Sequence, residues 1–223
     1  MIALAAVTLS LQIARTTLDA LDGVSIEVAA HNPSPHPVDV TFTQPSEYEI
    51  DILKGSRVVF TTLRALPSSV TFPPHTRALQ PGPSVLVVYI WNTIESDGTT
   101  PGGGSYTVRA RLLGKGVTPV ASTTIRFAAP TPIIALPKLK PSDEVTIAGR
   151  LDLTKAQITD STGTVALGRK LATAPDAPIA VRGYLTKNPV NGAPMFFVER
   201  WAPLEPLPAI AHIVKTEPSA TPH

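Results

Sequence analysis

Cysteine is absent from the 223-residue chain, and charged residues make up only 16% of it. The lack of cysteine excludes a disulfide framework, a thiolate metal site and a cysteine nucleophile. No apolar run approaches the roughly 18 residues that a membrane-spanning helix needs, so the sequence predicts no membrane span. Hydrophobic residues reach 43%, which is typical of a globular protein and not of a disordered one.

The formal net charge of +2 is too small and too scattered to predict nucleic-acid binding on its own. The 24 prolines exceed the average usage of about 5%. Together with many valine, isoleucine and threonine residues, they favour β-structure with proline-marked turns over helices.

The stretch from Val85 to Leu113 predicts two strands joined by a polar, glycine-rich loop. Residues Val85–Trp91 are apolar throughout, which predicts a strand with apolar side chains on both faces, in the middle of a sandwich. Tyr106–Leu112 alternates apolar and polar residues, so one of its faces is expected to be solvated. Tyr106 resembles a tyrosine corner, in which the hydroxyl bonds back to the loop backbone, and Trp91 is expected in the core.

Short alternating segments separated by turns fill the rest of the first half, and this spacing is typical of an all-β sandwich. The segments are 7–15, 24–32, 38–42, 48–52, 57–62 and 120–127. We therefore predict a sandwich domain over residues 1–128.

The second half has a different organisation. Residues 129–143 are rich in proline and do not alternate, which predicts a semi-rigid linker. Residues 144–205 hold five short strand patterns, two of which contain an interior glycine, Gly149 or Gly183, and this suits a small closed β-barrel. Residues 206–223 are predicted to form a flexible tail.

The first residues leave the compartment open. Met1–Val7 is interpreted as the entry to the first strand, since it has no basic segment and is too short for a signal peptide. Ala3-Leu4-Ala5 nevertheless has the form of a cleavage site. The sequence is therefore compatible with a soluble cytoplasmic protein, or with an exported one if a leader precedes Met1.

Residues Val38 to Leu113 resemble the BsuPI family of intracellular proteinase inhibitors. The resemblance is carried by Phe42–Ile50 (FTQPSEYEI), Lys54–Phe60 (KGSRVVF), Leu79–Gly82 (LQPG), and Trp91 followed by Gly103, Gly104 and Tyr106. The chain has Phe60 and Leu63 where the family usually has a tryptophan-rich hairpin. The resemblance implies an immunoglobulin-like β-sandwich that binds proteins and catalyses nothing. Residues Val145 to Trp201 are similar in layout to a minimal OB-fold, a five-stranded barrel.

No catalytic or metal-binding set can be assembled from the sequence. A G-x-S-x-G element is missing, and the glycines 102–104 lack the spacing of a phosphate-binding loop. His31 and His36 have no acidic or thiol neighbours at the spacing of metal ligands. We therefore predict no enzyme activity, no cofactor and no metal.

Two groups of residues are candidates for binding. The polar loop before Tyr106 could contact a protein partner, because loops often carry function. Its candidate residues are Glu95, Ser96, Asp97, Thr99 and Thr100. Basic and aromatic residues on a barrel face could bind single-stranded nucleic acid or a glycan. Their candidates are Arg150, Arg182, Tyr184 and Phe197, and at least one of Phe196 and Phe197 must be core because neighbours in a strand face opposite ways.

The sequence thus predicts an immunoglobulin-like sandwich followed by an OB-like barrel. We expect a non-enzymatic protein-binding module resembling proteinase inhibitors, with a protein, such as a proteinase, as the partner. One alternative is an OB-type binder of single-stranded nucleic acid or glycan. Another is a structural component of a cell-envelope assembly whose sheet edges pair with partners. The oligomeric state is left open.

Overall fold

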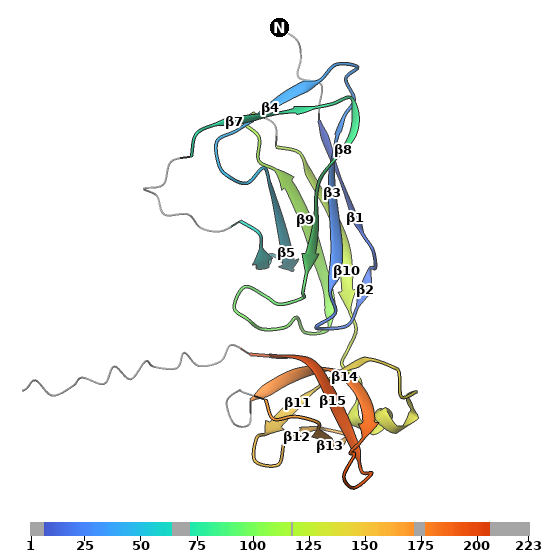
Figure 1. The fold of residues 1–223 in the computed structure, drawn as a ribbon. Coiled ribbons are helices and arrows are strands. Elements are labelled where there is room, and N and C mark those ends of the chain that lie inside the picture. The colour runs from blue at the N-terminus through green and yellow to red at the C-terminus, as the bar shows by residue number, and fades with distance from the viewer. Residues whose placement is uncertain (1–6, 64–71, 117, 172–176, 206–223) are drawn as a thin grey trace, which may run out of the picture.

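The computed structural model describes residues 7–63, 72–116, 118–171 and 177–205. This part of the chain is all β apart from one short 3-10 helix, as predicted (Figure 1). Its strands form several sheets, grouped into a larger N-terminal body and a smaller C-terminal one that lie end to end (Figure 1). The predicted tail 206–223 and Ala3–Ala5 lie outside the described residues.

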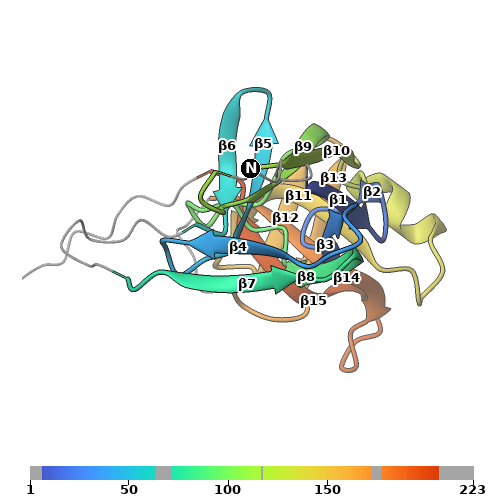
Figure 2. The same cartoon turned by 90° about the horizontal axis from the view of Figure 1, so that it is seen from above.

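The N-terminal body contains the first ten strands. They are β1 (Thr8–Ile13), β2 (Thr17–Leu18), β3 (Val24–Asn32), β4 (Val38–Phe42), β5 (Tyr48–Lys54), β6 (Arg57–Thr61), β7 (His75–Leu79), β8 (Gly82–Trp91), β9 (Gly104–Leu112) and β10 (Val120–Phe127). One sheet has the order β1-β3-β8 and a second has the order β2-β10-β9-β5-β6. The chain crosses between them early, because β1 pairs with β3 while β2 pairs in parallel with β10. The β4–β7 pair lies at the end of this body away from the C-terminal one (Figures 1 and 2).

Apolar side chains from both sheets form one core. Its members include Ile26 and Val28 of β3, Ile50 and Ile52 of β5, and Val108 of β9, all fully buried. Three aromatic rings close the end nearest the C-terminal body, with Phe127 edge-on to both Trp91 and Tyr106. The Tyr106 hydroxyl donates a hydrogen bond of 3.0 Å to the Gly102 carbonyl oxygen. The predicted tyrosine corner and the core position of Trp91 are therefore confirmed.

The predicted place of Val85–Trp91 in the middle of a sandwich is wrong. In the structure β8 is the last strand of its sheet, and the outward side chains of Val85, Val88 and Ile90 are 53%, 56% and 73% exposed. A β-bulge explains why Val85 and Val88 share the outward face. Leu86 has no partner on β3, and the alternation of side chains shifts by one residue there. An apolar run is compatible with either position, so the sequence could not distinguish them.

The C-terminal body is a closed ring of five strands, and all five predicted strands are present. They are β11 (Val145–Asp152), β12 (Gln157–Asp160), β13 (Gly163–Leu167), β14 (Pro178–Lys187) and β15 (Pro194–Pro203), in the order β11-β12-β13-β15-β14. The β13–β15 pair is parallel and the other four pairs are antiparallel. Ile147, Phe196 and other apolar residues fill the ring.

Two glycines let the strands of the ring approach one another. A Cβ atom on Gly149 would lie 2.3 Å from the Thr159 carbonyl oxygen, and one on Gly183 would lie 1.8 Å from that of Phe197. The β14–β15 register also shifts between Arg182 and Gly183. Both glycines were expected at bends, and the structure gives the reason, which is a backbone contact that excludes any side chain.

The segment predicted as a linker is partly built into the ring. It contains the 3-10 helix η1 (Ile133–Lys138), whose Ile133 and Leu136 are buried among the apolar residues of the ring. The Asp160 carboxylate accepts a 2.9 Å hydrogen bond from the Ile133 amide. These contacts are long-range, so the proline-rich composition could not predict them.

Candidate functional site

The loop between β8 and β9 folds on itself more than its polar sequence predicts. Of its five candidate residues, Glu95, Thr99 and Thr100 are buried, while Ser96 and Asp97 are exposed. The Glu95 amide donates to the Thr99 carbonyl oxygen at 2.7 Å. The Asp97 carboxylate accepts hydrogen bonds from the Thr99 amide and hydroxyl, at 3.0 and 2.6 Å. Only the tip of the predicted contact loop is therefore available to a partner.

The pKa values of two acidic residues in this loop are shifted in opposite directions. Burial raises the pKa of Glu95, and the Arg57 guanidinium 3.2 Å away offsets this only in part. Hydrogen bonds from Thr99 lower the pKa of Asp97. Burial thus disfavours the charged form of Glu95 relative to water, whereas hydrogen bonds favour the charged form of Asp97.

Glu95→Gln is expected to raise the melting temperature at pH 7. The folded-state pKa of Glu95 is raised, so protonation of this residue stabilises the fold. This contribution is fully present below the ordinary pKa of 4.5 and is lost as the pH rises through the folded-state pKa. Glutamine keeps an acceptor for Arg57 and carries no charge. Thermal unfolding at pH 7 and at about pH 4 would measure this, and the gain should shrink at the lower pH.

Asp97→Asn is the matched control for Glu95→Gln. The folded-state pKa of Asp97 is lowered, so its charged carboxylate stabilises the fold. This stabilisation is present above the ordinary pKa of 3.8 and is lost as the pH falls through the folded-state pKa. The substitution should therefore lower the melting temperature at pH 7. Equal changes of melting temperature with the same sign in both variants would contradict the opposite pKa shifts of Glu95 and Asp97.

The other side of this loop contacts the C-terminal body. Ala148, Ala180 and Ala202 lie in register on β11, β14 and β15 and form a flat outer face of the ring. Leu21, from the turn between β2 and β3, packs in one buried cluster with Ala180 and Ala202. The Thr100 amide donates to the Pro203 carbonyl oxygen at 3.1 Å. We call this contact between the two bodies the junction.

Polar groups surround the apolar part of the junction. The Thr146 hydroxyl donates a buried 2.6 Å hydrogen bond to the Ala20 carbonyl oxygen. Arg182 lies 3.4 Å from Asp19 and 3.8 Å from Asp22, with its side chain 12% exposed. Of the residues predicted to bind a ligand, Arg182 on the ring and Thr100 on the loop thus both contact the other half of their own chain.

Tyr184 and Phe197 are brought together as the sequence suggested. Their rings stack with centroids 5.1 Å apart, and Phe197 is 43% exposed. Phe196 is buried inside the ring, so the opposite orientation of these two phenylalanines is confirmed. A hollow of about 600 Å³ lies beside Tyr184 and is lined by Pro137, Leu139, Pro141, Tyr184, Leu185, Thr186, Lys187 and Pro194. Lys187 is the basic residue of this lining.

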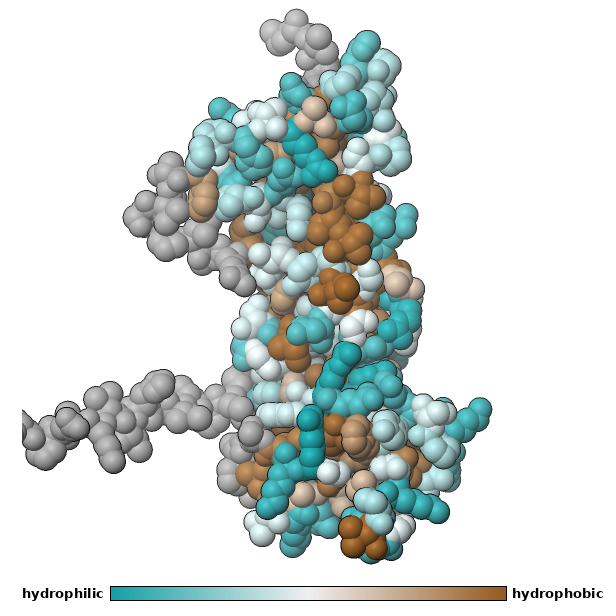
Figure 3. Space-filling model, viewed as in Figure 1, coloured by the Kyte–Doolittle hydropathy of each residue, from teal (hydrophilic) through white to brown (hydrophobic). Residues whose placement is uncertain are grey.

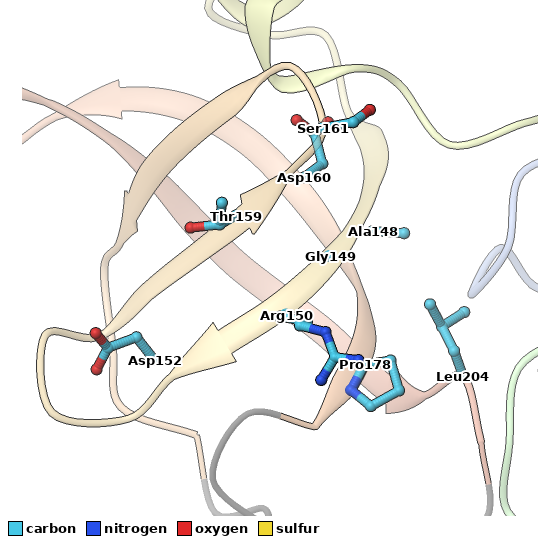
Figure 4. A pocket seen from close by; sticks show the side chains of 9 residues that line it. All are labelled: Ala148, Gly149, Arg150, Asp152, Thr159, Asp160, Ser161, Pro178 and Leu204. Carbon is cyan, nitrogen blue, oxygen red and sulfur yellow. The ribbon is translucent and has the colours of Figure 1, made fainter.

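Arg150 lies in a different hollow, of about 680 Å³, on β11 and β12 (Figure 4). Asp152 and Asp160 also line it. Burial favours the neutral form of Asp160, but hydrogen bonds from Thr162, Ile133 and Gly163 outweigh burial and hold its pKa below the ordinary value. Asp160 therefore has a structural role. The two candidate arginines, Arg150 and Arg182, do not lie around the pair Tyr184 and Phe197.

The carboxylates of the five-stranded sheet are paired with arginines. Asp51 and Glu49 on β5 are buried and bridge to Arg109 (2.6 Å) and Arg111 on β9. Both carboxylates thus lie in ion pairs across two neighbouring strands of the sheet. Within the described residues, no group of three histidine, aspartate or glutamate side chains could hold a metal ion, and no helix is long and apolar enough to cross a membrane.

An exposed apolar patch lies along β8. Figure 3 shows an apolar patch over this strand on the face drawn in Figure 1, and Val85, Val88 and Ile90 contribute to it. No residue from Gly82 to Trp91 is charged. Sequence reasoning identified the strand but missed its exposure, because no local signal separates a buried apolar strand from an exposed edge.

Comparison of the chain with protein-family models and with curated proteins found no match.

Proposed function

We propose that this chain is a non-enzymatic protein-binding module made of an immunoglobulin-like sandwich and an OB-like barrel. Two sheets, antiparallel apart from the β2–β10 pair, and a tyrosine corner at the start of β9 support the sandwich assignment. A closed ring of five short strands supports the barrel assignment. The junction between them supports a single rigid unit, since it combines a buried apolar cluster with hydrogen bonds.

The observation that carries the proposal is the exposed apolar edge of β8. Edge strands of natural proteins usually carry charged residues or prolines that prevent pairing with other chains. β8 has no charged residue and one proline, Pro83 near its start, and the Arg77 guanidinium donates to the Val85 carbonyl oxygen at 3.4 Å. Three aliphatic side chains of the strand are more than half exposed. An extended segment of a partner could add to this edge as a further strand, with main-chain hydrogen bonds supplying affinity.

The partner class is the one that the BsuPI resemblance implies, a proteinase, and a serine proteinase is the one to test. The exposed tip of the β8–β9 loop, Ser96 and Asp97, lies at the end of the same strand and could extend the contact.

Val88→Lys is expected to weaken proteinase binding by about tenfold or more. A lysine there would place an unpaired charge in the contact, and a tenfold loss corresponds to about 1.4 kcal/mol. The measurement is the residual activity of a serine proteinase titrated with the full chain. The wild-type chain should abolish that activity at an equal molar ratio.

Val120→Lys is the matched control. Val120 lies on β10, in the other sheet, and is 55% exposed against 56% for Val88. The Val120→Lys variant should inhibit the proteinase as the wild-type chain does. A wild-type chain without effect on the proteinase would rule out this partner class, and equal inhibition by the two variants would exclude β8 as the contact.

A second candidate function is ligand binding by the barrel. It is favoured by the stacked pair Tyr184 and Phe197 beside the hollow that Lys187 lines. Exposed aromatic faces stack with bases or sugar rings. The single lysine in the lining favours an uncharged or weakly charged ligand, such as a glycan, over nucleic acid.

A further inference from the structure

We infer that the turn between β2 and β3 is an electrostatic latch, whose two aspartates close the sandwich onto the ring by neutralising a pair of arginines. The arginines are Arg182 on β14 and Arg200 on β15, which lie directly opposite each other in the antiparallel register of these strands. Like charges on opposite residues destabilise a sheet. The ring therefore needs negative charge beside this pair, and the source of that charge decides whether the two bodies stay together.

Two of the three carboxylates around Arg182 belong to the other body. Arg182 lies 3.4 Å from Asp19 and 3.8 Å from Asp22, and its side chain is only 12% exposed. Arg200 donates a 3.2 Å hydrogen bond to a backbone carbonyl oxygen of the same turn. The third carboxylate, Glu144, precedes β11, lies 3.4 Å from Arg182 and is 46% exposed. Without the turn, one partly solvated carboxylate would remain for two arginines.

The turn can leave the ring and keep part of its own pairing. Asp22 has a second ion pair, 2.7 Å long, with Arg15 of its own body. Asp19 is 41% exposed, so water already reaches it in the closed chain. The fully buried apolar part of the junction is one leucine and two alanines, and the hydrogen bonds across it can be exchanged for bonds to water. Each body has an apolar core of its own, so opening leaves both interiors intact.

The closed latch covers part of an outer face of the ring. Tyr184 and Phe197 are the next outward pair along β14 and β15 after the two arginines. Phe197 is 43% exposed, whereas Arg182 is largely covered by the turn. Opening would therefore add two arginines to the aromatic pair, so the latch limits how much of this face a ligand can reach. This consequence rests on the proposed ligand role of the aromatic pair.

The charge pattern predicts effects of opposite sign for two successive substitutions. Asp19→Asn/Asp22→Asn removes the charge of the turn and should open the junction, which raises the radius of gyration in small-angle scattering by about a tenth or more. Adding Arg182→Gln removes the like-charge pair, so the chain should close again. Glu27→Gln/Asp39→Asn is the matched control, because it removes two negative charges from β3 and β4 of the same body. It should keep the wild-type radius.

Circular dichroism would verify that the strands of each variant are intact. An unchanged radius for Asp19→Asn/Asp22→Asn, an equal expansion of the control, or a triple variant that stays expanded would overturn the latch.

The ligand role of the aromatic pair is measured separately, as glycan binding with and without Phe197→Ala. Glycan binding that this substitution abolishes, in a chain whose radius does not respond to the aspartates, would support the ligand role and overturn the latch. A latch that responds as expected in a chain without glycan binding would support the latch and contradict the ligand role.

Discussion

Replacing Gly183 with alanine is expected to lower the free energy of unfolding of the C-terminal ring by more than about 3 kcal/mol. The added Cβ would lie 1.8 Å from the Phe197 carbonyl oxygen and 3.2 Å from the Phe196 ring. Overpacking a core usually costs about 1–3 kcal/mol when side chains can move aside. Here the obstacle is the backbone of β15, which is paired with β14 on both sides of the contact. Separating these strands would open the closed ring.

Gly168→Ala is the matched control for Gly183→Ala. Gly168 lies in the same body, and the atom nearest to its added Cβ would be the Phe196 carbonyl oxygen at 3.5 Å, which is ordinary contact. We expect a change within about 0.5 kcal/mol. Urea unfolding followed by the fluorescence of Trp201, in a Trp91→Phe background, would report on the ring. Equal effects of the two alanines would contradict the close approach at Gly183.

Replacing Ala180 with arginine is expected to separate the two bodies of the chain. Ala180 is fully buried under Leu21 in the junction, and the outward face of the ring leaves no room there for a long side chain. Burial of a charge without a partner typically costs several kcal/mol, so the junction should open instead of burying it. The ring interior should remain intact, because the side chain of Ala180 points away from it.

Small-angle scattering and calorimetry would measure this effect. The wild-type chain should have a compact radius of gyration and one cooperative transition, and Ala180→Arg should have a larger radius and two transitions. Ala193→Arg is the control, since it adds the same charge on an exposed turn of the same ring. An unchanged radius for Ala180→Arg would mean that the junction does not hold the bodies together.

Much of the local structure could be predicted. Alternation of apolar and polar residues located the strands of both bodies except β2 and β7, and glycine inside a strand located Gly149 and Gly183. The spacing of Tyr106 after a glycine-rich loop predicted its backbone hydrogen bond. These features depend on neighbours close in sequence, which a single chain displays directly.

The candidate site could not be predicted in the same way. The polar residues Thr100 and Arg182 were expected to face a ligand, but they contact the other half of the chain, more than a hundred residues away in the case of Arg182 and Asp19. The apolar strand β8 was expected in the interior and lies at an edge. In each case the type of residue is visible in the sequence, but its neighbours in the folded chain are not.

Side-chain periodicity established that this chain forms β-strands with two apolar interiors and an interruption between them, because a strand exposes alternate residues to opposite faces wherever it lies. Periodicity carries no information about which strand ends a sheet or which outer face another body covers. Those choices depend on the pairing of segments distant in sequence, and here they exposed Val88 and Ile90 while they buried Leu21 and Thr100.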